Sequence, residues 1–186
     1  MTTVTRLRAP LTDEQILPLK AGDAVLIDGT VFGARDAAHA QLVEALRRGE
    51  VLPIELTGQI LYYVGPAPAR PGHPIGSAGP TTSGRMDRYT PELLAAGLRA
   101  TIGKGHRGGA VRESIVAHRC LYLAAIGGSG AMLAKRIIGS EVVAYEELGP
   151  EAIYRFEVRD FPAVVVNDAH GLDLYEMSRE EYCERA

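Results

Sequence analysis

The chain has 186 residues, of which 46% are hydrophobic and 23% are charged, and its formal net charge is −3. This length and balance favour one soluble globular domain with a sizeable core. Because the net charge is slightly negative and no apolar stretch approaches the roughly 20 residues of a membrane span, neither nucleic acid nor a membrane is an expected partner.

The hydrophobic pattern switches between strands and helices along the chain. Thr12 and Gln15 form a predicted capping box for a short first helix that ends near Pro18. Strands are predicted at 24–27, 30–32 (after an Asp28-Gly29 turn), 59–64, 100–102, 121–126, 141–145, 153–158 and 163–167. Longer helices are predicted at 37–48, 91–96, 110–118 and 130–138. The helix–strand alternation in the middle, with strand-rich ends, indicates one mixed α/β domain over residues 1–186.

Cysteine and histidine usage limits the metal chemistry of the chain. Cys120 and Cys183 are its only cysteines and lie far apart, so no disulfide framework is expected. An iron–sulfur cluster needs several cysteine ligands at defined spacings, so this chain cannot hold one by itself. The histidines show no ligand spacing, and no metal site is expected. Residues 1–6 lack the apolar core of a signal peptide, which favours a cytoplasmic location.

Three loops place cations beside glycines and hydroxyl groups after predicted strands. The cations are Arg35, then Arg85, then Lys104 with Arg107. Arginine can bind a carboxylate bidentately, and lysine supplies a compact point charge. Two or three such residues converging on one pocket would suit a small dicarboxylate. For any one loop taken alone, the simpler interpretation is a structural turn carrying a solvated charge.

Two glycine-containing loops precede predicted helices, the first cation loop and the loop 127–130. Asp36 fits the N-cap position of the helix 37–48, so Arg35 is placed just ahead of a helix N-terminus, where backbone N–H groups favour an anion. The loop 127–130 (GGSG) also precedes a helix, but it lacks the Gly-Lys-Ser/Thr ending of a phosphate-binding loop. A tight strand–helix turn is therefore predicted there.

The segment 79–87 (GPTTSGRMD) resembles the signature of the C-terminal domain, or β subunit, of class I fumarases and the related L-tartrate dehydratases. Other segments resemble the same family in order along the chain. They are its first arginine loop at 33–39 (GARDAAH), its lysine loop at 103–105 (GKG) and its closing strand pair at 148–154 (LGPEAIY) and 160–163 (DFPA). The similarity runs from about Leu17 to Tyr175 and so covers nearly the whole chain.

The resemblance implies a swivelling β/β/α domain in three layers and a hydro-lyase that reversibly hydrates fumarate to L-malate. In this family a [4Fe–4S] cluster is held by three cysteines of the other domain, and its open iron acts as a Lewis acid. The implied partner is therefore a cluster-bearing α subunit, in an α2β2 heterotetramer that is active only when assembled. The native-looking start and the lack of an upstream linker favour a separate subunit over a fragment of a fused enzyme.

The same resemblance implies roles for the cations. Arg35, Arg85 and Lys104 are expected to bind the carboxylates of the substrate, and Thr81 is expected near the reacting carbon as a candidate for proton transfer. A threonine hydroxyl is a poor base. The adjacent cations would have to stabilise its alkoxide, or the hydroxyl would relay the proton to a carboxylate of the partner.

Five further residues match the motifs and are candidates for supporting the site: Asp36, His39, Thr82, Ser83 and Gly84. Asp36 and His39 are interpreted first as a helix cap and a first-turn polar residue. The alternative is that they aim the arginine beside them. Thr82 and Ser83 are expected to satisfy backbone groups in their loop.

The chain departs from the family pattern at one place, because His106 stands where the fumarases often have asparagine, so no role is assigned to it. Gly84 and Asp87 are closer to the fumarase version of the signature than to the tartrate dehydratase version, which tends to have a bulkier residue and a glutamate. This favours fumarate and L-malate. The alternatives are an L-tartrate or mesaconate-type dehydratase and a module that binds a dicarboxylate without chemistry.

Overall fold

The computed structural model describes residues 4–184, so residues 1–3 of the stretch considered for a signal peptide lie outside it. Its strands are β1 (Thr5–Arg8), β2 (Ala24–Gly33), β3 (Ile60–Tyr62), β4 (Ala100–Gly103), β5 (Leu121–Ala124), β6 (Ile137–Ala144) and β7 (Ile153–Asn167). Its α-helices are α1 (Asp13–Ile16), α2 (Asp36–Arg47), α3 (Thr90–Ala95), α4 (Gly109–Ala117), α5 (Gly130–Ala134) and α6 (Leu174–Glu184). Two 3-10 helices are η1 (Ser83–Met86) and η2 (Glu146–Glu151). Among the described residues, no helix has the length and apolar character needed to cross a membrane.

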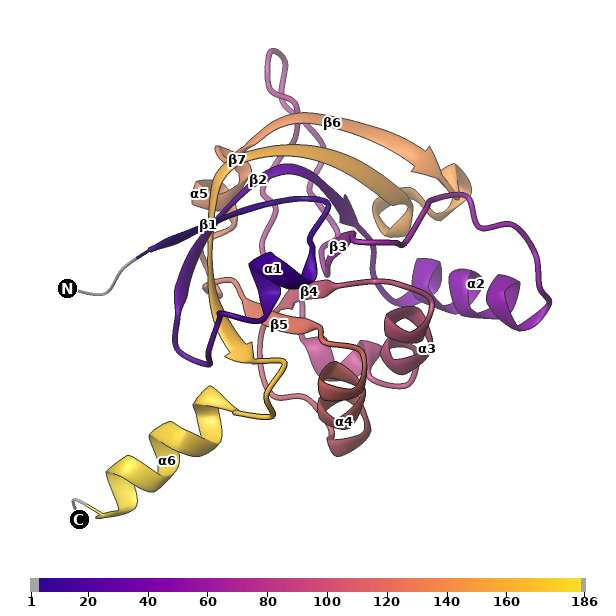
Figure 1. Ribbon diagram of the computed structural model, residues 1–186. Helices are drawn as coiled ribbons and strands as arrows, with labels where there is room; N and C mark the ends of the chain where they lie inside the picture. The colour runs from indigo at the N-terminus through magenta and orange to yellow at the C-terminus, as the bar shows by residue number, and fades with distance from the viewer. Residues whose placement is uncertain (1–3, 185–186) are drawn as a thin grey trace.

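The strands form one mixed sheet in the order β1-β2-β3-β4-β5-β7-β6. Strands β1 to β5 pair in parallel, and β7 runs antiparallel to its neighbours β5 and β6. Strand β7 also pairs with β2 over most of the length of β2. Because β7 pairs with both β2 and β5, the sheet closes on itself, and Figure 1 shows the long strands curving around the interior.

Two breaks predicted between strands are wrong, because the pairing of β2 with β7 continues through both of them. The segments 24–27 and 30–32 are one strand, β2, and the Asp28-Gly29 turn signal is only an irregularity in its pairing with β7. The predicted closing pair 153–158 and 163–167 is likewise one strand. Within it Asp160 has a φ of 49°, and its N–H donates to the Asp28 carboxylate at 2.8 Å. The long β2–β7 ladder supplies more backbone hydrogen bonds than two local turns would.

The segment before β6 is another difference from the predicted elements, and β1 and α6 were not predicted at all. Helix α5 ends at Ala134 and β6 begins at Ile137, whereas the sequence pattern predicted a helix through residue 138. Strand β6 pairs with β7 from Ile137 onward. A short apolar run does not distinguish helix from strand by itself, and here pairing with β7 selects the strand.

Two hydrophobic cores divide the molecule into three layers. Strand β3 and the residues just after it alternate between them: Ile60 and Tyr62 face the core inside the closed sheet, whereas Leu61 and Tyr63 face the core under α2, α3 and α4. All four are buried. Two sheet layers and one helical layer form the β/β/α arrangement that the resemblance implied, and Figure 1 shows α2, α3 and α4 together on one side. The swivelling of this domain stays a prediction.

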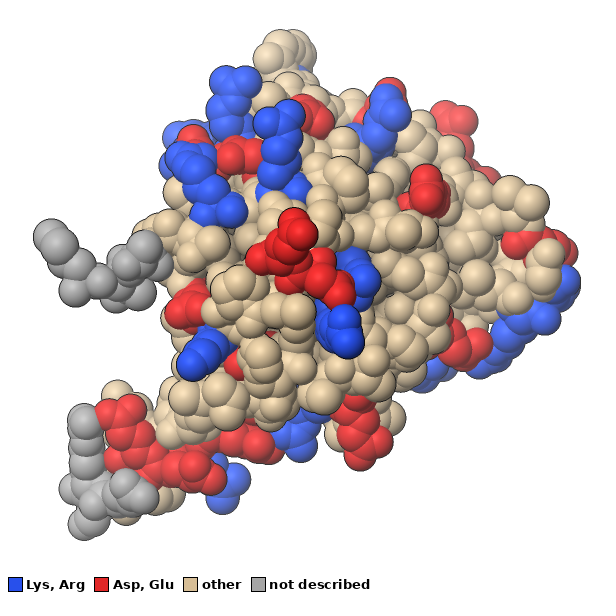
Figure 2. All heavy atoms as spheres, in the orientation of Figure 1, with Lys and Arg blue, Asp and Glu red and all other residues tan. Residues whose placement is uncertain are grey.

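Charged side chains are distributed unevenly over the surface. Figure 2 shows acidic and basic residues interspersed over the main body and acidic ones gathered along α6, which projects from it. The first turn of α6 is anchored, because Arg112 of α4 forms ion pairs with Asp173 and Glu176. The face in view therefore carries no continuous basic surface.

The topology brings four loops to one edge of the sheet. Strands β2 to β5 are parallel, so the loops that follow them all begin at the same edge, which is where α/β sheets bind ligands. Strand β7 starts at this edge, since Tyr154 pairs with Gly33 at the end of β2. The three predicted cation loops and the segment before β7 are thereby neighbours.

Candidate active site

The signature loop and the lysine loop run side by side as if they were a continued pair of strands. The N–H of Lys104 donates to the carbonyl of Thr81 at 3.3 Å, and the N–H of Ser83 donates to the carbonyl of Lys104 at 2.9 Å. Thr82 and Lys104 form an isolated parallel bridge. Two segments that lie far apart in the sequence are thus locked in register.

The close approach of these loops depends on Gly103 and Ser83. A Cβ on Gly103 would lie 2.0 Å from Oγ of Ser83, so no other residue fits there without displacing the loop. Ser83 is buried, and its hydroxyl donates to the hydroxyl of Tyr122 at 3.0 Å rather than to the backbone groups expected from sequence. Thr82 and Gly84 are exposed. Ser83 thus anchors the signature loop to Tyr122 of β5.

Asp36 lies between the two predicted substrate-binding arginines. Its Oδ2 is 2.9 Å from Nη2 of Arg85 and 3.5 Å from Nε of Arg35. The predicted helix cap is therefore wrong by one residue: Arg35 occupies the N-cap position, and Asp36 is the first residue of α2. Its side chain points to the cations instead of back to the helix, because two guanidinium groups attract a carboxylate more strongly than one backbone N–H does.

Glu151 is part of this cluster, although sequence reasoning assigned it no role. Its Oε1 accepts a hydrogen bond from Nη2 of Arg35 at 2.6 Å, and its Oε2 accepts one from the N–H of Ala37 at 2.9 Å. The only signal in the sequence was its place within the segment 148–154 that resembles the family. No local pattern could pair it with a helix so far away along the chain.

Thr81 and Lys104 complete the group of predicted residues. The Thr81 hydroxyl lies 3.5 Å from Nη1 of Arg85, at the limit of a hydrogen bond. Lys104 is exposed, and its side chain passes over Gly127, where a Cβ would lie 3.6 Å from Cδ of Lys104. Within residues 4–184, its ammonium group takes part in no ion pair or hydrogen bond. It is the freest of the cations at this edge.

Arg107 is turned away from this edge, contrary to its predicted grouping with Lys104. Its guanidinium is buried and donates to Asp87 at 2.7 Å and to the hydroxyls of Thr90 and Thr101 at 2.7 and 3.1 Å. The side chain points inward because Asp87 and the hydroxyls of Thr90, Thr101 and Tyr63 all accept its N–H groups there. Arg107 ties the signature loop to the lysine loop.

His39 is a buried residue of the first part of α2. Its Nδ1 lies 3.0 Å from the carbonyl oxygen of Arg35, and its ring meets that of Tyr63 edge-on at 5.1 Å. Burial lowers the pKa of His39 to about 4, partly opposed by the bond to the Arg35 carbonyl. The imidazole is therefore neutral at physiological pH. It contacts the backbone of Arg35 and does not reach the guanidinium.

The cysteines do not form a cluster site. Cys120 is buried and its thiol contacts the carbonyl of Leu98, whereas Cys183 is exposed on α6. In the described part of the chain, no group of three or more His, Cys, Asp or Glu could hold a metal ion. The residues present do not fit an iron–sulfur cluster.

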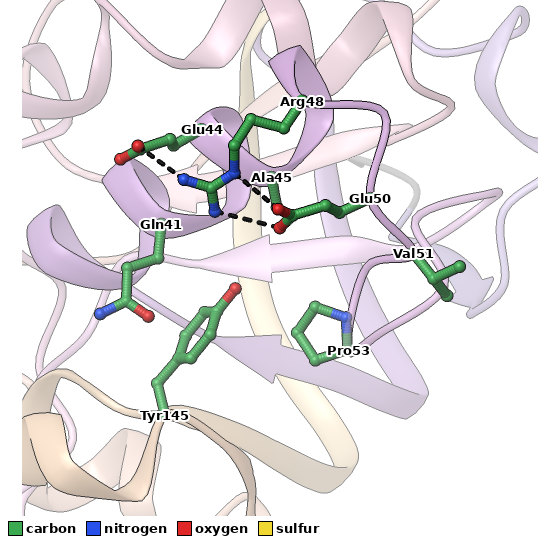
Figure 3. A pocket seen from close by; sticks show the side chains of 8 residues that line it. All are labelled: Gln41, Glu44, Ala45, Arg48, Glu50, Val51, Pro53 and Tyr145. Atoms are coloured by element: carbon green, nitrogen blue, oxygen red, sulfur yellow. Dashed lines mark hydrogen bonds and ion pairs between the residues drawn. The ribbon is translucent and has the colours of Figure 1, made fainter.

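Two surface hollows lie away from this edge. One has a volume of about 360 Å³ and lies near the C-terminal end of α2. Arg48 in it is already paired with Glu44 and Glu50, both at 2.7 Å (Figure 3). A larger, mostly apolar hollow of about 730 Å³ lies between the loop 67–77 and the segment 131–138. Neither is lined by the predicted cations. The candidate site at the sheet edge lies outside both hollows.

The fold and this edge define a β/β/α domain that presents two arginines, a lysine and a threonine at one edge of its sheet. The chain matches the family model described as "Fumarase C-terminus" over residues 2–178. It belongs to the Fumarase C-terminus family.

Relatives of two lengths match the chain. A "Fumarate hydratase class I, aerobic" of Salmonella typhimurium is 38% identical over 181 residues, which cover 95% of this chain and 31% of the relative. "Fumarate hydratase 2" of Leishmania major is 41% identical, over 87% of this chain and 29% of the relative. A Methanocaldococcus jannaschii protein, named as a candidate L(+)-tartrate dehydratase subunit beta, is 35% identical over 94% of this chain and 93% of its own length. The chain thus spans less than a third of these fumarate hydratases.

Proposed function

We propose that this chain is the β subunit of a class I fumarate hydratase and supplies the carboxylate-binding residues for the reversible hydration of fumarate to L-malate. The observation that carries the proposal is the grouping of Arg35 and Arg85 around Asp36 at one sheet edge, with Thr81 beside Arg85 and Lys104 bridged to the same loop. Membership of the Fumarase C-terminus family and the fumarate hydratase names of the relatives support the reaction class.

The three cations would contribute differently to binding a dicarboxylate, because they differ in exposure and in existing partners. Arg85 has one ion pair and a side chain that is 49% exposed, and Lys104 is exposed and unpaired among the described residues, so both can accept a new carboxylate. Arg35 is held by Glu151 and lies beside Asp36, so it adds fixed positive charge and its remaining N–H groups. Together they bind two carboxylates and orient the carbon between them.

Thr81 is the residue of this chain proposed to move a proton. Its hydroxyl lies beside Nη1 of Arg85, and a neighbouring cation favours the alkoxide form. That form could accept a proton from the carbon next to a carboxylate bound by Arg85. Alternatively, the hydroxyl passes the proton to a carboxylate of the partner.

The proposal assigns the [4Fe–4S] cluster to a separate α subunit, in an α2β2 assembly located in the cytoplasm. The lack of a fitting ligand set in residues 4–184 supports a second component. So does the relative of matching length, which is named as a subunit beta. The cluster would supply Lewis-acid chemistry, and the residues of this chain would bind and orient the substrate.

L-Tartrate dehydration is the second candidate, and one observation favours it. The relative that the chain covers over 93% of its length carries an L(+)-tartrate dehydratase name, whereas the fumarate hydratases are much longer. L-Malate and L-tartrate are both small dicarboxylates, so the same cations would bind either one. L-Tartrate has one more hydroxyl group than L-malate, and residues of the partner would have to recognise it.

Anaerobic reconstitution with the co-purified, cluster-bearing partner tests the proposal. We expect L-malate and fumarate to interconvert, and Arg85→Ala to lower kcat/KM by more than about tenfold while the protein stays folded. The control is Arg88→Ala, because Arg88 lies in the same loop but stacks on Tyr89 away from the cluster. Tartrate turnover without malate turnover would select the second candidate. Calorimetric binding of dicarboxylates by the chain, with no turnover in any assembly, would show a binding module.

A further inference from the structure

Glu151 connects the first arginine of the site to the start of helix α2. One oxygen of its carboxylate accepts from Arg35 at 2.6 Å, and the other accepts from the N–H of Ala37 at 2.9 Å. We propose that Glu151 is a positioning residue, which fixes the Arg35 guanidinium relative to α2 and keeps it from taking Asp36 away from Arg85. This inference rests on the proposed function for its catalytic consequence.

The start of α2 explains why a carboxylate is needed from elsewhere. Arg35 occupies the N-cap position, and its side chain makes no capping hydrogen bond. The first N–H groups of a helix have no partner within the helix, and its N-terminal end favours negative charge. Glu151 supplies both an acceptor and a charge to this 12-residue helix. The same carboxylate can therefore orient Arg35 and complete α2.

The position of Glu151 is itself fixed by the fold. It directly precedes Ala152 and Ile153, which are 1% and 0% exposed at the start of β7. The backbone of Gly65, just after β3, also approaches the guanidinium, because a Cβ there would lie only 2.7 Å from Nη1 of Arg35. Arg35 therefore lies against two segments that are each continuous with a strand of the sheet.

Removing Glu151 would change the partners of the whole cluster. Nε of Arg35 already lies 3.5 Å from the Asp36 oxygen that pairs with Arg85 at 2.9 Å. Without Glu151, Arg35 would turn toward that oxygen, since its guanidinium is only 27% exposed and a partly buried charge that loses its counter-charge attracts the nearest carboxylate. Asp36 would then hold Arg85 less firmly. The loss of one carboxylate that touches neither Arg85 nor the substrate would thus weaken substrate binding.

The first test needs only the isolated chain. Proton–nitrogen NMR detects the Nε–H of each ordered arginine, and Arg35→Lys identifies the Arg35 signal by its disappearance. We expect this signal to be resolved in the wild type, shifted in Glu151→Ala because Nε moves onto the Asp36 carboxylate, and unchanged in Glu147→Ala. Glu147 is the matched control, an exposed glutamate of the same 3-10 helix. An unaltered Arg35 signal in Glu151→Ala would overturn the proposal.

The second test uses the reconstituted hydro-lyase with L-malate. We expect Glu151→Ala to raise KM about tenfold and to change kcat by less than about threefold, as loss of binding geometry requires. Glu151→Gln should recover part of the KM, because its amide oxygen still accepts one of the two hydrogen bonds. A purely structural role predicts a lower kcat at unchanged KM, with no recovery, and would refute positioning. If the wild-type assembly hydrates no dicarboxylate, the proposed function fails, and the NMR result alone decides the role of Glu151.

Discussion

The carboxylate of Asp36 and the guanidinium of Arg85 form an ion pair of 2.9 Å between the start of α2 and the signature loop. The same oxygen lies 3.5 Å from Nε of Arg35. One carboxylate between two guanidinium groups keeps both at the sheet edge against their mutual repulsion. The pair is only partly shielded from water, since the side chains of Asp36 and Arg85 are 25% and 49% exposed.

This relationship predicts the effect of Asp36→Asn. We expect KM for the dicarboxylate to rise about fivefold, because Arg85 loses the charge that orients it, while the free energy of unfolding falls by less than about 1 kcal/mol. Steady-state kinetics and urea denaturation measure the two quantities. Glu113→Gln, at an exposed position of α4, is the control. A lower KM would contradict the prediction, because it would mean that Asp36 competes with the substrate.

Gly65→Ala is predicted to displace Arg35. The added Cβ would lie 2.7 Å from Nη1 and 3.0 Å from Cδ of Arg35, and 3.3 Å from the carbonyl oxygen of Pro150. The guanidinium would have to leave the Gly65 backbone and Glu151, so we expect KM to rise about tenfold. Gly109→Ala is the matched control, since nothing lies within 4 Å of its Cβ position. Equal kinetics of the two variants would show that Arg35 adapts without loss.

Asp87→Ala is predicted to reduce stability more than any substitution at the exposed cations. Asp87 accepts hydrogen bonds from Nε of the buried Arg107 at 2.7 Å and from the N–H of Gly108 at 2.6 Å. Its removal leaves a buried guanidinium without its counter-charge, which costs about 3 kcal/mol in the free energy of unfolding. Urea denaturation measures this change. Glu113→Ala should change the free energy of unfolding by less than about 0.5 kcal/mol. An equally small effect for Asp87→Ala would show that the Asp87–Arg107 ion pair does not stabilise the fold.

His39 is predicted to make stability depend on pH in the acidic range. Burial lowers its pKa to about 4 in the folded state, whereas an unfolded histidine titrates near its ordinary value. Between these values the unfolded state binds more protons, so acidification favours unfolding. From about pH 7 to about pH 5, this histidine should lower the free energy of unfolding by about 2 kcal/mol.

The measurement is urea denaturation at both pH values for the wild type and His39→Phe. The variant should lose about 2 kcal/mol less on acidification than the wild type does. His73→Gln should behave as the wild type, because His73 is exposed in the loop 67–77. A pH dependence that is identical in His39→Phe and the wild type would show that His39 does not titrate in this way.

Features that depend on neighbouring residues were predictable from the sequence. The run 59–64 predicted a strand, which is observed as β3, and the amphipathic pattern of 37–48 predicted α2 to within one residue at each end. The signature around Arg85 was sufficient to indicate the family, which the match over residues 2–178 confirms. Local periodicity and motif spacing carry this information because they reflect contacts within one element.

The partners of each side chain were decided by the tertiary structure. Lys104 and Arg107 share one loop, yet Lys104 is exposed and Arg107 is buried against Asp87, Thr90 and Thr101, because packing rather than composition determines which way a side chain points. Asp36 was interpreted first as a helix cap, with aiming of Arg35 as the alternative, and it lies between the two arginines. Glu151, which pairs with Arg35, was left without a role.

The sequence by itself therefore determined the class of the domain and the cations that it presents. Closure of the sheet through β2 and β7 decided the rest, because it brings the segment before β7 to the start of α2. That closure is a long-range pairing with no local signal in the sequence. It is the reason that Glu151 meets Arg35.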